Sequence, residues 1–60
     1  MSTVYNPEAE TIAEIEKLEI ELLGLLRRLA RAGGAEDKRV LQQQIDEVQQ
    51  AIATLRSRVP

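Results

Sequence analysis

Carboxylates are the most numerous reactive side chains of the sequence, and six of them lie close together between residues 8 and 21. They are Glu8, Glu10, Glu14, Glu16, Glu19 and Glu21. Two carboxylates can divide general acid and base roles between them only where a cleft gives them different environments. A chain of 60 residues is too short to enclose such a cleft, so this cluster predicts a solvated acidic helix face.

The sequence contains neither His nor Cys, which narrows the remaining chemistry. Most zinc, haem and transition-metal sites use these residue types, and a di-metal site in a helical bundle would need Glu-x-x-His motifs. No Ser or Thr lies beside a residue that would activate it as a nucleophile. We therefore expect no enzyme, no metal site and no cofactor. The chain lacks Cys and any apolar run near the roughly 20 residues of a membrane span, so we expect a cytoplasmic location.

A group of basic residues flanks positions 33 and 34 and is the one candidate patch for binding phosphate. It consists of Arg27, Arg28, Arg31, Lys38 and Arg39. Such residues bind RNA phosphates through their charge. However, Glu36 and Asp37 lie among them, no aromatic residue is nearby for base stacking, and the formal net charge is −2. We interpret the group as ordinary charge at helix ends and do not favour nucleic acid as a partner.

The elements that carry these side chains are two helices, and the first is expected over about residues 7–32. Asn6 is a good N-cap, and Pro7 suits the first helical position. Residues 1–6 show no helical pattern, so they are expected to form a flexible tail. The apolar arc of this helix spans roughly half of its circumference, which is wide for a helix with a single neighbour.

The second helix is expected over about residues 35–58, after a turn formed by Gly33 and Gly34. Glycine adopts the left-handed conformation that ends many helices, so this pair indicates a short turn between antiparallel helices. The apolar stripe of the second helix is narrow, like a coiled-coil seam. Residues 7–60 therefore predict one all-α domain, an antiparallel helical hairpin.

The two helices can be aligned so that the numbers of facing residues add up to 67. The apolar layers are then Leu26 with Leu41, Leu22 with Ile45, Ile15 with Ile52, and Ile12 with Leu55. The layer of Glu19 and Val48 breaks this series, and Leu18 is expected to fill the gap. At the open end the alignment brings opposite charges together: Glu8, Glu10 and Glu14 beside Arg56 and Arg58.

The first helix has more apolar surface than the second can cover. Leu18, Leu23 and Leu25 are expected at the flanks of its arc, and full burial of such a side chain contributes roughly 1.5–3 kcal/mol. A hairpin of this length is marginally stable alone. We therefore predict a homodimeric four-helix bundle, or another helical protein in the place of the second copy. The predicted interface comprises Ile12, Ile15, Leu18, Leu22, Leu23, Leu25, Leu26, Leu29, Leu41, Ile45, Val48, Ile52 and Leu55.

Three residues of the first helix depart from its pattern. Gly24 and Ile20 lie on its polar side, where they are either tolerated exceptions or a second contact patch with a close backbone approach. Glu19 falls inside the apolar arc, where it either reaches a Lys or Arg across an interface or turns outward into solvent. The sequence leaves both alternatives open.

The segment ARAGGAEDKRVLQQQIDEVQQAIATL closes the first helix and opens the second, and it resembles two groups of small bacterial proteins. One is the family of E-type co-chaperones of type III secretion needle subunits. These are short cytoplasmic helical hairpins that join a second chaperone to keep the needle protein from polymerising. The other is the FlxA-like group, which is similar in its Leu and Gln spacing. In architecture the chain is also similar to Rop, a dimeric hairpin that binds RNA.

These observations predict a non-enzymatic protein–protein interaction module, an oligomeric adaptor or co-chaperone that acts through the Leu-rich face of its first helix. Three alternatives remain open. The first is a small regulator or inhibitor of a host protein, for example one encoded by a phage. The second is an RNA-binding hairpin dimer that uses its basic residues. The third is a designed helical scaffold.

Overall fold

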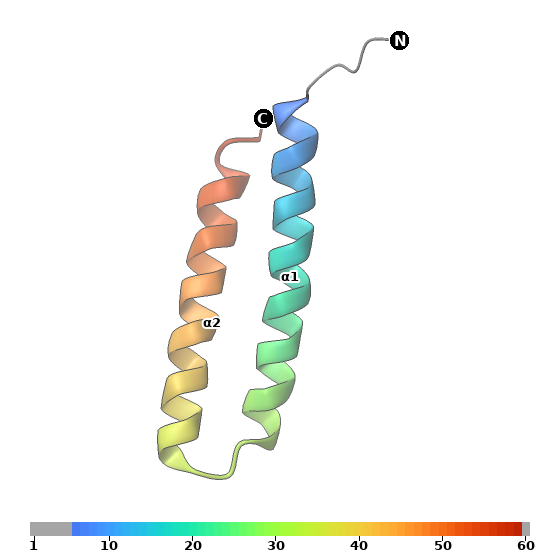
Figure 1. Cartoon of the computed structure of the whole chain (residues 1–60). Helices are drawn as coiled ribbons and strands as arrows, with labels where there is room; N and C mark the ends of the chain where they lie inside the picture. Colours follow the sequence, from blue (N-terminus) through green and yellow to red (C-terminus); the bar gives the residue numbers. More distant parts are fainter. Residues whose placement is uncertain (1–5, 60) are drawn as a thin grey trace.

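The computed structural model describes residues 6–59 and consists of two helices that lie side by side in opposite directions (Figure 1). Helix α1 spans Pro7–Arg31 and helix α2 spans Ala35–Arg56. This confirms the predicted all-α helical hairpin, although α2 ends two residues earlier than expected. The predicted flexible tail falls mainly on residues 1–5, which lie outside the described residues, as does residue 60.

The start of α1 is fixed by the cap that the sequence predicts. The side-chain oxygen of Asn6 accepts hydrogen bonds from the backbone amides of Glu8 and Ala9, at 3.0 and 3.2 Å. Pro7 occupies the first turn, where its missing N–H leaves no helical bond unmade. Such a cap is typically worth about 1 kcal/mol, so the first helical residue is set locally by two neighbouring side chains.

The turn between the helices is built differently from the prediction. No glycine in the described residues adopts the left-handed conformation. Ala32 follows α1 with an extended backbone, at φ −67° and ψ 131°, and Gly34 precedes α2 with φ −98° and ψ 148°. The expectation of a left-handed glycine is wrong, because extended residues at the two helix ends already reverse the chain.

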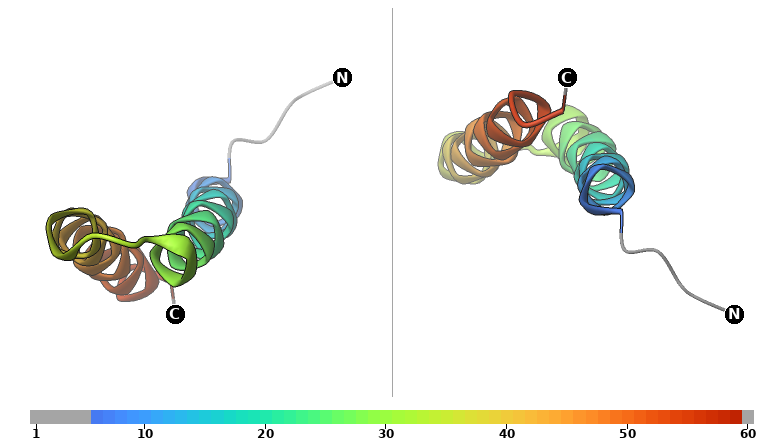
Figure 2. Two further views of the ribbon diagram at one scale, coloured as in Figure 1. Left: turned by 90° about the horizontal axis from the view of Figure 1, so that it is seen from below. Right: turned by 90° about the horizontal axis from the view of Figure 1, so that it is seen from above.

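The described residues form a single layer, which the end views in Figure 2 show directly. The layer is one helix thick, because its two helices lie side by side and no further described element covers them. Only the line between the helices is enclosed. Within residues 6–59 the buried hydrophobic side chains are Ile15, Ile45 and Ile52, so both broad faces of the hairpin meet solvent.

The side of α1 that faces α2 carries a continuous row of buried or partly buried residues. We refer to it as the first stripe: Thr11, Ile15, Leu18, Leu22, Leu25, Leu29 and Ala32. The matching side of α2 is formed by Leu41, Ile45, Val48, Ala51, Ile52, Leu55 and, beyond the helix, Val59. The spacing of three and four residues is that of a coiled-coil seam.

This packing corrects the predicted register. Ile12 and Leu26 are each 43% exposed, so the layers that paired them with Leu55 and Leu41 are wrong. Leu25, expected at a flank, lies in the first stripe instead. Leu18 lies there too, in agreement with the prediction that it fills the gap at the layer of Glu19 and Val48. The physical reason is continuity: the row through Leu18 and Leu25 has no charged member, whereas the row through Ile12 and Leu26 contains two glutamates.

The turn geometry predicts that Gly33→Ala is tolerated. A Cβ at this position would meet no atom within 4 Å, and the backbone of Gly33 does not have a positive φ. Replacing a glycine in a compatible conformation stabilises by about 0.4–1 kcal/mol, because it restricts the unfolded chain.

Urea unfolding followed by circular dichroism, at a fixed chain concentration, measures this effect. Asn6→Ala is the contrasting variant and should lose about 1 kcal/mol with its cap. A Gly33→Ala chain that unfolds more easily than the parent would show that the turn needs a left-handed glycine after all.

Candidate interaction surface

A second row of residues runs along α1, and each member follows a member of the first stripe by one position. We refer to it as the second stripe: Ile12, Glu16, Glu19, Leu23, Leu26 and Ala30. One residue turns an α-helix by about 100°, so this row faces roughly at right angles to the direction of α2. All six members are exposed. Helix α1 therefore has the pattern of a bundle helix with two neighbours, of which the hairpin supplies one.

The apolar members of the second stripe are large and accessible. Ile12, Leu23 and Leu26 are 43%, 49% and 43% exposed, and only Ile20 and Val40 are comparable among the described residues. Single exposed hydrophobic residues are ordinary on protein surfaces. Three at coiled-coil spacing on one helix flank are typical of a surface that packs against another helix.

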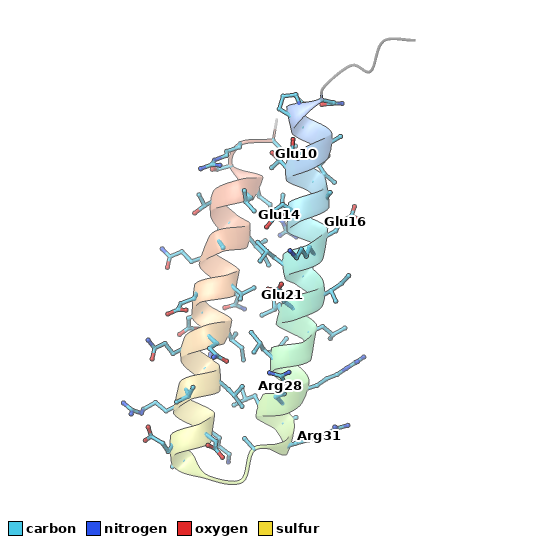
Figure 3. The ribbon with its side chains drawn as sticks, in the orientation of Figure 1. Glu10, Glu14, Glu16, Glu21, Arg28 and Arg31 are labelled. Carbon is cyan, nitrogen blue, oxygen red and sulfur yellow. The ribbon has the colours of Figure 1, made fainter. Side chains whose placement is uncertain are left out.

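The opposite flank of α1 is charged. Figure 3 shows on this side of the helix Glu10, Glu14, Glu21 and Arg28. Two open grooves of the same face join this flank to α2, one at Leu55 and the other at Val40. The two broad faces of the hairpin thus differ, because the flank of α1 is largely apolar on one face and charged on the other.

An ion pair joins the two helices in the middle of the second stripe. Arg56 of α2 donates from Nη2 to Oε2 of Glu19 at 2.6 Å. The pair borders an open groove of about 550 Å³ whose other lining residues are Leu22, Gln49, Ile52 and Ala53. Glu19 therefore reaches an arginine across the hairpin interface, as one of the two sequence alternatives predicts.

The partner of Arg56 corrects the predicted pairs at the open end of the hairpin. The Glu8, Glu10 and Glu14 side chains were expected beside Arg56 and Arg58. Within residues 6–59 the ion pairs closer than 4.0 Å are instead Arg56 with Glu19 and Arg39 with Glu36. The long arginine side chain extends along the groove and so meets a carboxylate well inside the helix.

The predicted interface residues divide into two groups. Most of them hold the hairpin together: Ile15, Leu18, Leu22, Leu25 and Leu29 with Leu41, Ile45, Val48, Ile52 and Leu55. Ile12, Leu23 and Leu26 remain available for another molecule. The sequence analysis predicted one wide apolar arc and did not separate the second stripe from the first. The signal that separates the two stripes is that each member of the second follows a member of the first by one residue.

The basic residues near the turn do not form one surface. Arg28 and Arg31 border a groove with Asp37, Val40 and Leu41. Arg27 precedes Arg28 by one residue, so it projects about 100° away from it. Arg39 is held by Glu36 at 2.8 Å. The predicted patch is thus divided between sides of the hairpin and accompanied by acidic residues.

The acidic residues of α1 are likewise spread around the helix rather than gathered. Within residues 6–59 no three Asp or Glu side chains are placed to hold a metal ion. Neither described helix combines the length and apolar character that crossing a membrane requires.

The positions of Ile20 and Gly24 match the sequence prediction. Ile20 is 73% exposed, and a Cβ at Gly24 would meet no atom within 4 Å. Gly24 borders a small open groove with Glu21, Leu25 and Arg28. Within the hairpin, nothing in the described residues approaches the backbone of Gly24 closely.

Comparisons with protein-family models, with curated proteins and with solved structures found no match. The resemblance to needle co-chaperones and FlxA-like proteins therefore stays a prediction. What this surface binds has to be inferred from its own side chains.

The open surroundings of Gly24 predict that Gly24→Ala stabilises the chain. Alanine favours the helix over glycine by about 0.5–1 kcal/mol, and the added methyl group meets no neighbour. The measurement is thermal and urea unfolding, with helix content from circular dichroism. A loss of stability in Gly24→Ala would instead reveal a close contact at this position, and hence a second contact patch around Ile20.

Proposed function

We propose that this chain is a non-enzymatic protein–protein interaction module, a helical-hairpin adaptor or co-chaperone that binds through the second stripe of α1. Binding occurs by burial of one helix surface against another. Ile12, Leu23 and Leu26 serve as apolar anchors, and Glu16 and Glu19 supply the polar centre of the same stripe. The first stripe acts indirectly, because it holds α1 rigid against α2.

The observation that carries this proposal is the uncovered second stripe on a single-layer molecule. Burying exposed apolar surface contributes roughly 25 cal/mol per Å², and a layer of two helices covers only one side of each. A second layer is the ordinary way to gain the rest. The occupant is either a second copy, which gives a homodimeric four-helix bundle, or another helical protein.

Nucleic acid is a weaker candidate for the occupant. The basic residues are divided between sides of the hairpin, and Arg39 is already bound by Glu36. Salt separates the two mechanisms: phosphate binding weakens steeply as salt rises, whereas burial of apolar side chains does not.

The proposal predicts that Leu26→Glu weakens self-association, whereas Ile20→Glu does not. Both changes replace an exposed apolar residue of α1 with a good helix former, but only Leu26 belongs to the second stripe. Loss of a central apolar anchor costs roughly 2 kcal/mol or more, which raises the dissociation constant about thirtyfold. Sedimentation equilibrium over a range of chain concentrations measures both constants.

The parent chain should approach twice its mass of 6.7 kDa at high concentration, in low and in high salt. A parent chain that stays at 6.7 kDa throughout, with full helicity, contradicts self-association. Equal constants for Leu26→Glu and Ile20→Glu would show that association uses another surface.

A further inference from the structure

The two broad faces of the hairpin are not equivalent for a second copy. On the charged face, Glu14 and Glu21 stand beside the first stripe, so a second layer there would bring carboxylates toward its core. On the other face, Ile12, Leu23 and Leu26 extend the apolar surface next to the buried Ile15 and Ile52. Of the two glutamates on that face, Glu16 and Glu19, the second is paired with Arg56. Desolvating unpaired charge is costly and burying apolar surface is favourable, so the second copy belongs on the face of the second stripe.

The size of this face fits a stable contact between two copies. A specific interface buries about 800 Å² on each partner, which is about a sixth of the 4943 Å² of accessible surface of the chain. The broad face of the hairpin, formed by two helices side by side of which α1 has 25 residues and a length of roughly 37 Å, supplies that area. A contact around a two-fold axis covers the same stripe on both copies at once.

The side chains of α2 on this face decide how the copies are oriented. With the two hairpins parallel, the second stripe would lie over the partner's α2, whose adjacent flank carries Gln42, Asp46, Gln49 and Arg56. With the hairpins antiparallel, α1 lies over the partner's α1 instead. The leucine and isoleucine side chains of the two α1 helices then face one another, and the polar flanks of the two α2 helices face one another, so the antiparallel arrangement is favoured.

The charged centre of the stripe sets the position of the axis. An axis beside Glu19 brings Ile12 of each copy opposite the partner's Leu26. It also brings together two Glu19–Arg56 pairs, so that two carboxylates and two guanidinium groups alternate around the axis. Each pair is exposed in the hairpin, with Arg56 61% and Glu19 46% accessible. The neighbouring register, which pairs Ile12 with the partner's Leu23, would instead set Glu16 against the partner's Glu19, so the charged layer distinguishes the two registers.

Charge complementarity on α2 agrees with the same axis. Glu19 shares its groove with Gln49 and Ala53, so the α2 residue level with it is Ala51, midway between them. Arg56 lies five residues after Ala51, and Asp46 lies five residues before it. A two-fold axis at this height therefore brings Arg56 of each copy level with the partner's Asp46.

From these features we infer that two copies of this chain dock through their second stripes, α1 antiparallel to α1, around a two-fold axis beside Glu19. This arrangement rests on the proposed function and specifies its partner and geometry. The Glu19–Arg56 pair is then the element that sets orientation, and the apolar residues on either side of it supply the affinity.

A disulfide experiment tests the arrangement, because the parent chain has no Cys and each variant has one thiol. Glu19→Cys places the thiol beside the axis, where it meets its own copy, and oxidation should convert most of the chain to a covalent dimer. Lys17→Cys is the matched control, near the same height but on the opposite flank of α1, and should remain uncrosslinked.

Charge exchange supplies a second measurement on the same axis. Arg56→Glu sets four carboxylates around it and should raise the dissociation constant about tenfold or more. The double exchange, Glu19→Arg with Arg56→Glu, restores the alternation of charge and should restore association.

The outcomes separate the arrangement from the proposed function. A dimeric parent chain with crosslinking through Lys17→Cys, or with none through Glu19→Cys, overturns this arrangement and leaves self-association standing. A parent chain that is monomeric at every concentration overturns both. A heavier assembly that forms only with an added helical protein overturns the inference and supports the alternative occupant.

Discussion

The constraint that governs this molecule is that two antiparallel helices touch along one line. A residue on that line is enclosed by both helices, and a residue one position further along the chain points about 100° away. Among the described residues, the buried hydrophobic side chains are accordingly three isoleucines, Ile15, Ile45 and Ile52. Within residues 6–59, every other apolar side chain either lies at the edge of this line or faces solvent, so the hairpin leaves both of its broad faces uncovered.

The consequence for function lies in the asymmetry of α1. Its two flanks have the same spacing and the same length, yet one carries charges and the other carries Ile12, Leu23 and Leu26. Two glutamates, Glu16 and Glu19, interrupt the apolar residues of the second stripe. Arg56 pairs with Glu19 from within the hairpin, so the middle of this flank is polar and its two ends are apolar.

Local signals in the sequence determine much of this fold. Asn6 and Pro7 fix the start of α1, and the seam spacing of both helices predicts the hairpin, because these effects depend on neighbouring residues only. The turn conformation was not predictable from Gly33 and Gly34, since glycine is compatible with extended as well as left-handed backbone.

The register depended on a choice between two overlapping apolar rows. The two rows differ by one position, and both contain leucines at helical spacing, so matched layers could be drawn through either. Glu16 and Glu19 interrupt one of the two rows. The other row has no charged member, and it is the one that packs against α2. The ion pair of Arg56 with Glu19 was not predicted for a related reason. Residue spacing shows which positions lie level with one another, but it does not show how far a long side chain extends along a groove.

The central claim is that the second stripe is covered in the functional molecule, and isoleucine methyl groups report this most directly. The chain has five isoleucines, which give five methyl signals in a selectively labelled sample, and a soluble paramagnetic agent measures the accessibility of each. In the associated chain the methyl group of Ile12 should be protected like those of Ile15, Ile45 and Ile52, while that of Ile20 stays accessible. An Ile12 methyl group as accessible as that of Ile20 at every chain concentration would contradict the account.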